Sequence, residues 1–109
     1  MPIAGRRLSP ASRTIDVVPV PGDAATFDVT LREGATETRH RVAVATGEAA
    51  KFSGLAPECI VRATMEFLLD REPKESILAA FDIGVVRRYF PDFDRALPDY
   101  LARLADSES

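Results

Sequence analysis

The sequence predicts an α+β fold, in which a small antiparallel β-meander of two or three strands precedes a C-terminal half of about four short helices. Residues 14–45 alternate apolar and polar side chains, which is typical of strands, and residues 57–71 repeat apolar side chains at helical spacing. Prolines then divide the remaining apolar stripes into short segments. We expect a single domain over residues 13–105, between disordered tails at 1–12 and 106–109.

The first expected strand covers residues 14–20. Its β-branched residues favour extended backbone, but Pro19 cannot donate a hydrogen bond to a neighbouring strand and restricts the segment to a sheet edge. Whether this segment is a true third strand stays open at this point. Residues 26–33 and 36–45 alternate regularly, and they form the two firm strands of the meander.

The register between those two strands follows from turn chemistry and charge. Pairs whose residue numbers sum to 69 place Gly34 first in a two-residue turn, where a type II′ turn prefers glycine. This register also gives two opposite-charge pairs on the outer face, whereas the neighbouring one gives a single pair. The predicted pairs are Phe27 with Val42, Asp28 with Arg41, Val29 with His40, Leu31 with Thr38 and Arg32 with Glu37.

The main helix is expected at about residues 57–71, with Pro57 in its first turn. Its apolar side chains span an arc of about 200°, so we expect it to contact both the sheet and other helices. Three shorter helices should follow. They are expected at 74–81, at 83–90 with Asp82 as N-cap, and after Pro91, where Pro98 should kink or divide the last helix.

A charge cluster, residues 70–75, interrupts the apolar pattern between the first two of these helices. It contains the carboxylates and cations of the string DREPKE. Carboxylates serve acid–base chemistry only where burial separates their pKa values, and a polar helix end is a poor place for such burial. We therefore expect a solvated linker here, with Phe67 in the core just before it.

The strings FLLDREPKESIL (67–78), FD (81–82) and YFP (89–91), with the strand TRHRVAV (38–44), resemble a group of short bacterial proteins. The resemblance covers residues 36–92. It implies a β-rich N-terminal part and a helical C-terminal part. It implies no activity and no functional residues, because none is assigned to the group.

Two reactive side chains occur once each in the sequence. His40 could act as a base or a metal ligand, but no second histidine or nearby cysteine accompanies it, so we expect it to pack on Val29 at the rim of the inner sheet face. Cys59 falls in the first turn of the main helix, where a thiol can be activated. Since only His40 could serve as its base, a structural cysteine is the preferred interpretation.

The binding site we predict is formed by Gly84, Arg87 and Arg88. Their spacing puts them on one helix face, opposite the apolar stripe, where a missing side chain lets a carboxylate or phosphate approach two guanidinium groups. An alternative is that residues 77–90 form a helix-turn-helix-like segment that associates with nucleic acid. Against this, Pro91 would fall inside the recognition helix, and the C-terminal half is net negative.

Composition restricts the function further. The formal net charge of −3 does not favour nucleic acid or an anionic membrane, and no nucleotide-binding, zinc-protease or calcium-binding motif is present. A single cysteine fits a reducing cytoplasm. We expect a small cytoplasmic interaction or regulatory module rather than an enzyme, with no cofactor and no metal, and with another protein as partner. The oligomeric state stays open.

Overall fold

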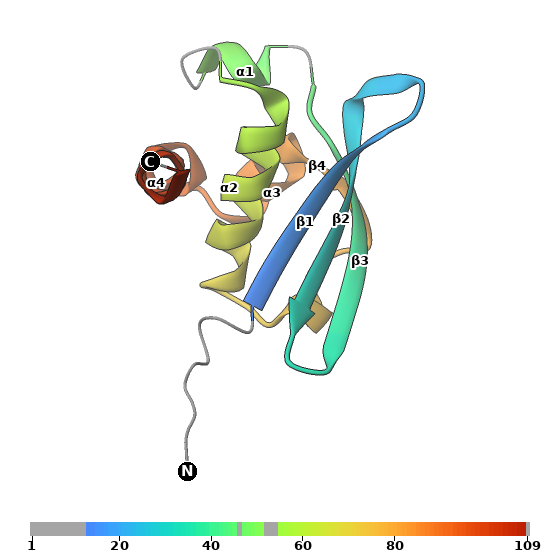
Figure 1. Ribbon diagram of the computed structural model, residues 1–109. Helices are drawn as coiled ribbons and strands as arrows, with labels where there is room; N and C mark the ends of the chain where they lie inside the picture. The colour runs from blue at the N-terminus through green and yellow to red at the C-terminus, as the bar shows by residue number, and fades with distance from the viewer. Residues whose placement is uncertain (1–12, 46, 52–54, 109) are drawn as a thin grey trace.

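The computed structural model describes residues 13–45, 47–51 and 55–108 (Figure 1). A four-stranded sheet has the order β1-β2-β3-β4, in which the first three strands form an antiparallel meander and β4 runs parallel to β3. The strands are β1 (Arg13–Val20), β2 (Asp23–Glu33), β3 (Thr36–Ala43) and β4 (Ala80–Asp82). The α+β class is confirmed, but the sheet has one strand more than the two or three expected.

Helix α2 lies between the sheet and α4, so the layers are sheet, α2 and α4 (Figure 1). Residues 55–108 of the described chain contain three α-helices instead of about four. The helical elements are α1 (Glu48–Lys51), α2 (Pro57–Leu69), the 3₁₀ turn η2 (Lys74–Ser76), α3 (Ile83–Tyr89) and α4 (Phe93–Glu108). The expected tail at 1–12 lies outside the described residues, whereas residues 106–108 continue α4.

The predicted register of β2 and β3 is confirmed. Val29 is paired with His40, and Asp28 is paired with Arg41, whose Nε lies 2.9 Å from the carboxylate. Gly34 occupies the first turn position with φ of +59°, a backbone conformation that glycine adopts without steric cost. The turn chemistry and the outer charge pairs therefore specify the same pairing.

Strand β1 is a true third strand, and it lies at the edge of the sheet as Pro19 predicts. The Arg62 side chain from α2 donates a hydrogen bond of 2.6 Å to the Ile15 carbonyl. Pro19 lacks an N–H, and Arg62 satisfies a carbonyl of β1. Both features reduce the capacity of this edge to pair with another strand.

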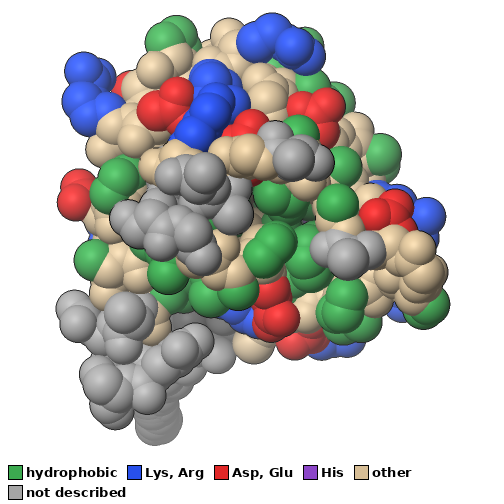
Figure 2. All heavy atoms as spheres, turned by 90° about the horizontal axis from the view of Figure 1, so that it is seen from above, with side chains coloured by type: hydrophobic (Ala, Val, Ile, Leu, Met, Phe, Trp, Pro, Cys, Tyr) green, Lys and Arg blue, Asp and Glu red, His purple; other side chains and the backbone are tan. Residues whose placement is uncertain are grey.

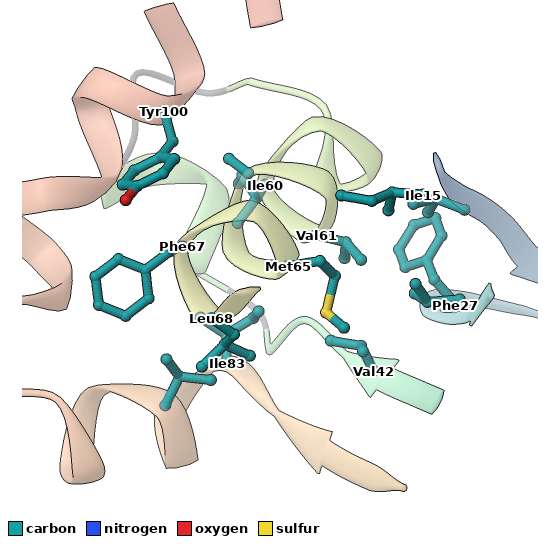
Figure 3. Close-up of a cluster of buried hydrophobic side chains, with 14 of the residues drawn as sticks. Ile15, Phe27, Val42, Ile60, Val61, Met65, Phe67, Leu68, Ile83 and Tyr100 are labelled. Carbon is teal, nitrogen blue, oxygen red and sulfur yellow. The ribbon is translucent and has the colours of Figure 1, made fainter. Parts of the chain in front are cut away.

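Helix α2 buries two faces, as its wide apolar arc predicts (Figure 3). Val61 and Met65 point toward the sheet, while Phe67 lies on the side of α4. The Phe67 ring is fully buried, and its centroid lies 5.2 Å from that of Phe93 and 5.9 Å from that of Tyr100, both in edge-to-face geometry. The core is therefore continuous from the sheet through α2 to α4.

The prediction of a helix at residues 74–81 is wrong. Only Lys74–Ser76 form a 3₁₀ turn, and the chain then becomes extended and adds β4 to the sheet. The Arg41 N–H donates to the Ala79 carbonyl at 2.8 Å, and His40 Nδ1 lies 2.7 Å from the Leu78 carbonyl oxygen. Hydrogen bonds to β3 thus override the helical apolar spacing of this segment.

The two last helices begin largely as expected. The Asp82 carboxylate accepts a hydrogen bond of 3.1 Å from the Val85 N–H and caps α3. Helix α4 continues past Pro98 as one element, so of the expected kink or division the division does not occur. Pro98 removes one hydrogen bond to the Asp94 carbonyl, and both residues are exposed, which allows water to satisfy that oxygen.

The charge cluster is not a simple solvated linker, which corrects the sequence analysis. The Lys74 side chain is only 4% exposed, and its Nζ lies 2.7 Å from Glu75 and 3.5 Å from Glu33. The Arg71 guanidinium lies 3.7 Å above the Phe67 ring and 2.8 Å from Asp92. The cluster therefore attaches the end of α2 to β2 and to the start of α4.

Candidate functional site

An open apolar groove of about 340 Å³ lies beside the C-terminal end of α2. Its two rim side chains are large and exposed, Leu78 by 52% and Tyr89 by 71%. Two large exposed apolar side chains that line one concave apolar surface are typical of an interaction site, whereas single exposed apolar residues are ordinary. The lining residues are Leu68, Glu72, Ser76, Ile77, Leu78, Phe81, Val85, Val86, Tyr89 and Phe90.

Consecutive elements between α2 and α3 build this groove. The last turn of α2 supplies Leu68, the extended segment before β4 supplies Ile77 and Leu78, and β4 and α3 supply further apolar side chains. Neighbouring side chains of an extended backbone point to opposite sides, so Ile77 is buried while Leu78 is exposed. The His40 ring holds the Leu78 carbonyl, which fixes this segment against β3.

Among the described lining residues, polar groups come from Glu72, Ser76 and the Tyr89 hydroxyl, and Glu72 alone is charged. Glu72 is half-buried and forms no ion pair with any residue that the structure describes. The nearest cations in sequence, Arg71 and Lys74, are already paired with Asp92 and with Glu75 and Glu33. The groove is thus an apolar surface with one uncompensated carboxylate.

Arg87, predicted to lie free on a solvent-facing surface, is instead held inside the molecule. Its guanidinium donates two hydrogen bonds to Glu48 and one of 2.7 Å to Asp94, and it is only 23% exposed. The bond from Arg87 holds the pKa of the Asp94 carboxyl below its ordinary value. These contacts join α1, α3 and α4, a role that the helix spacing alone does not indicate.

The other two predicted binding residues differ in their surroundings. A Cβ on Gly84 would lie 3.0 Å from the Asp82 carboxylate oxygen that caps α3, so the missing side chain leaves room for the cap. Arg88 is exposed, and among the described residues it has no ion-pair partner. The binding of an anion by Gly84, Arg87 and Arg88 stays a prediction. Of the two arginines, Arg87 is already paired with Glu48 and Asp94.

His40 is buried, with 5% of its surface exposed, and both ring nitrogens have partners. Nδ1 lies 2.7 Å from the Leu78 carbonyl oxygen, which can only accept, so Nδ1 carries a proton. Nε2 then accepts from the Thr38 hydroxyl at 2.8 Å in the neutral ring. The histidine therefore has a structural use for each of its nitrogens.

Cys59 is partly buried in the first turn of α2.

Residues 77–90 do not form the two helices of a helix-turn-helix. They contain the extended segment, β4 and the single helix α3. The face in Figure 2 carries interspersed acidic and basic side chains with hydrophobic ones gathered between them, rather than a uniformly basic surface. The outline that suggested nucleic-acid binding is therefore absent from the backbone.

The groove is not evident from the sequence, because helices at 74–81 and 83–90 would bury the apolar residues that line it. A usable signal was the adjacent pair Ile77-Leu78, since in an extended segment one member of such a pair must leave the core.

Within the described ranges, no group of three or more histidine, cysteine, aspartate or glutamate side chains is placed to hold a metal ion. None of the helices among the described residues is long and apolar enough to cross a membrane. No protein-family model, curated protein or solved structure matches this chain. The resemblance of residues 36–92 to the bacterial group stays a prediction.

Proposed function

We propose that this protein is a non-catalytic interaction module that binds an apolar segment of another protein in the groove beside α2. The observation that carries the proposal is the exposure of Leu78 and Tyr89 at the rim of a concave apolar surface. Exposed apolar area of this kind lowers the free energy of association when a partner covers it.

The form of the groove favours a protein segment over a small molecule. Small-molecule sites enclose most of the surface of their ligand. Here Leu78 and Tyr89 are 52% and 71% exposed, so the groove is too open to enclose a small ligand. Nucleic-acid association through residues 77–90 is not proposed, because that segment lacks the motif on which the idea depends.

Site-specific photo-crosslinking in cells that naturally make the protein tests the proposal. A photoreactive phenylalanine analogue in place of Tyr89 should crosslink a discrete protein partner, and Leu78→Asp in the same chain should abolish the crosslink. The control places the analogue at Val18, which is 57% exposed on the sheet. Equal crosslinking from both positions, or crosslinking unaffected by Leu78→Asp, would reject the groove as a protein-binding site.

A further inference from the structure

We infer that the segment bound in the groove carries a lysine or arginine beside its apolar anchors, and that Glu72 receives this cation. The inference rests on the proposed function and specifies the chemistry of the partner. It follows from the electrostatics at one end of the groove, where the Glu72 carboxylate is half-buried and has no ion-pair partner among the described residues.

Glu72 is held where negative potential is already present. Its backbone N–H donates to the Leu68 carbonyl at 2.9 Å, which places the residue just beyond the last turn of α2. The C-terminal end of a helix carries partial negative charge, and a basic side chain in the last turn ordinarily offsets it. The Arg71 guanidinium donates to the Phe67 carbonyl at 3.3 Å and offsets part of this charge, but no cation among the described residues pairs with Glu72 itself.

The cations on either side of Glu72 are already paired. Arg71 stacks on Phe67 and pairs with Asp92 at 2.8 Å. Lys74 is buried, and it lies between Glu75 and Glu33. Neither can move to Glu72 without leaving a paired acid behind and removing a packed side chain from its site. A cation that pairs with Glu72 would therefore come from outside the described residues.

This arrangement also discriminates between partners. Glu72 is half-buried before anything binds, and a partner that covers the groove removes more water from its carboxylate. A purely apolar segment would leave that carboxylate desolvated and unpaired, which is unfavourable, whereas a segment with a correctly placed cation forms a charge-assisted hydrogen bond. The groove should thus select basic-apolar segments and reject acidic ones.

Selection from a phage-displayed library of random linear peptides tests the inference. Peptides selected on the wild-type protein should combine apolar anchors with a lysine or arginine, and their affinity should fall about tenfold in Glu72→Gln, as expected for loss of a charged hydrogen bond. Selection on Glu72→Arg should enrich acidic peptides in their place. Glu58→Gln, the same substitution at the other end of α2, is the control and should leave affinity unchanged.

The outcomes separate the two proposals. If selected peptides lose affinity in Leu78→Asp but show no basic residue and no dependence on Glu72, the groove binds protein segments and the charge inference is overturned. If peptide affinity is indifferent to Leu78→Asp, the proposed function fails as well. If light scattering shows concentration-dependent dimers that Leu78→Asp disperses, the occupant is a second copy of this chain, and the inference is overturned in favour of self-association.

Discussion

The Arg87 guanidinium and the Glu48 carboxylate face each other in a two-bond pair, with N–H···O distances of 3.0 and 3.1 Å. Glu48 is 7% exposed, and the third Arg87 contact is to Asp94 at 2.7 Å. Bidentate arginine–carboxylate pairs have fixed geometry and are stronger than exposed ion pairs. One side chain of α3 therefore connects α1 to the start of α4.

Removal of this guanidinium should be costly. Arg87→Leu leaves the Glu48 carboxylate buried without its partner, so we expect a loss of about 3 kcal/mol in the free energy of unfolding, the lower end for a broken buried pair. Arg88→Leu, at the exposed neighbouring position, should change it by no more than about 0.5 kcal/mol. Chemical denaturation of both variants measures the difference. Equal losses would show that the Glu48 pair contributes nothing specific.

Phe67 should be the most sensitive aromatic position in the core. Its ring is fully buried and makes edge-to-face contacts with Phe90, Phe93 and Tyr100. Phe67→Ala should cost about 3–5 kcal/mol, a large share of the stability of a domain of this size. Tyr89→Ala, at an exposed aromatic, is the control and should stay within about 0.5 kcal/mol. A loss at Phe67 as small as that at Tyr89 would contradict the packing.

Lys74 should contribute more to the stability of the fold than its place in a charged turn suggests. Its stem is buried, and its ammonium lies between two carboxylates, so Lys74→Ala should lower the melting temperature by several degrees. Lys74→Met keeps the stem and should recover part of the loss. Ser76→Ala, in the same turn but exposed, should have little effect. Thermal melts in which Lys74→Ala and Ser76→Ala are indistinguishable would restore the solvated-linker interpretation.

The parts of the fold that could be predicted are those specified by local patterns. One register for β2 and β3 follows from the apolar–polar alternation, from Gly34 and from the Asp28–Arg41 pair. The wide apolar arc of α2 predicts that this helix packs on two sides, against the sheet and against other helices. Asp82 likewise caps α3 where its position in the sequence suggests. In each case, short-range chemistry and tertiary packing favour the same structure.

The parts that could not be predicted depend on contacts between distant residues. β4 forms because β3 offers a free edge, where the Arg41 N–H donates to the Ala79 carbonyl, and no local pattern in residues 77–82 encodes that edge. Likewise, no local sequence feature indicates that Arg87 pairs with Glu48, which lies 39 residues earlier. The groove depends on both, since it lies between the extended segment and α3.

Tyr100 should make the protein less stable at alkaline pH. Burial raises the pKa of its hydroxyl, and so does the hydrogen bond of 2.5 Å that it donates to Asp70, against a smaller opposing effect of Arg71. In the unfolded chain a tyrosine ionises near pH 10, so above that pH the unfolded state has lost a proton that the folded state keeps. Unfolding then releases a proton, and the free energy of unfolding falls as pH rises through the folded pKa.

The measurement compares wild type with Tyr100→Phe by chemical denaturation from neutral pH to about pH 11, a range that spans the ordinary tyrosine pKa. At neutral pH the variant should lose about 1 kcal/mol through the missing hydrogen bond. Above about pH 10 the two curves should converge, because only the wild type carries the tyrosine whose ionisation is resisted in the folded state. Since a single proton is involved, the free energy of unfolding of the wild type should fall relative to the variant by no more than about 1.4 kcal/mol per pH unit. Curves that stay parallel over the whole range would show that Tyr100 ionises as readily in the folded protein as in the unfolded chain.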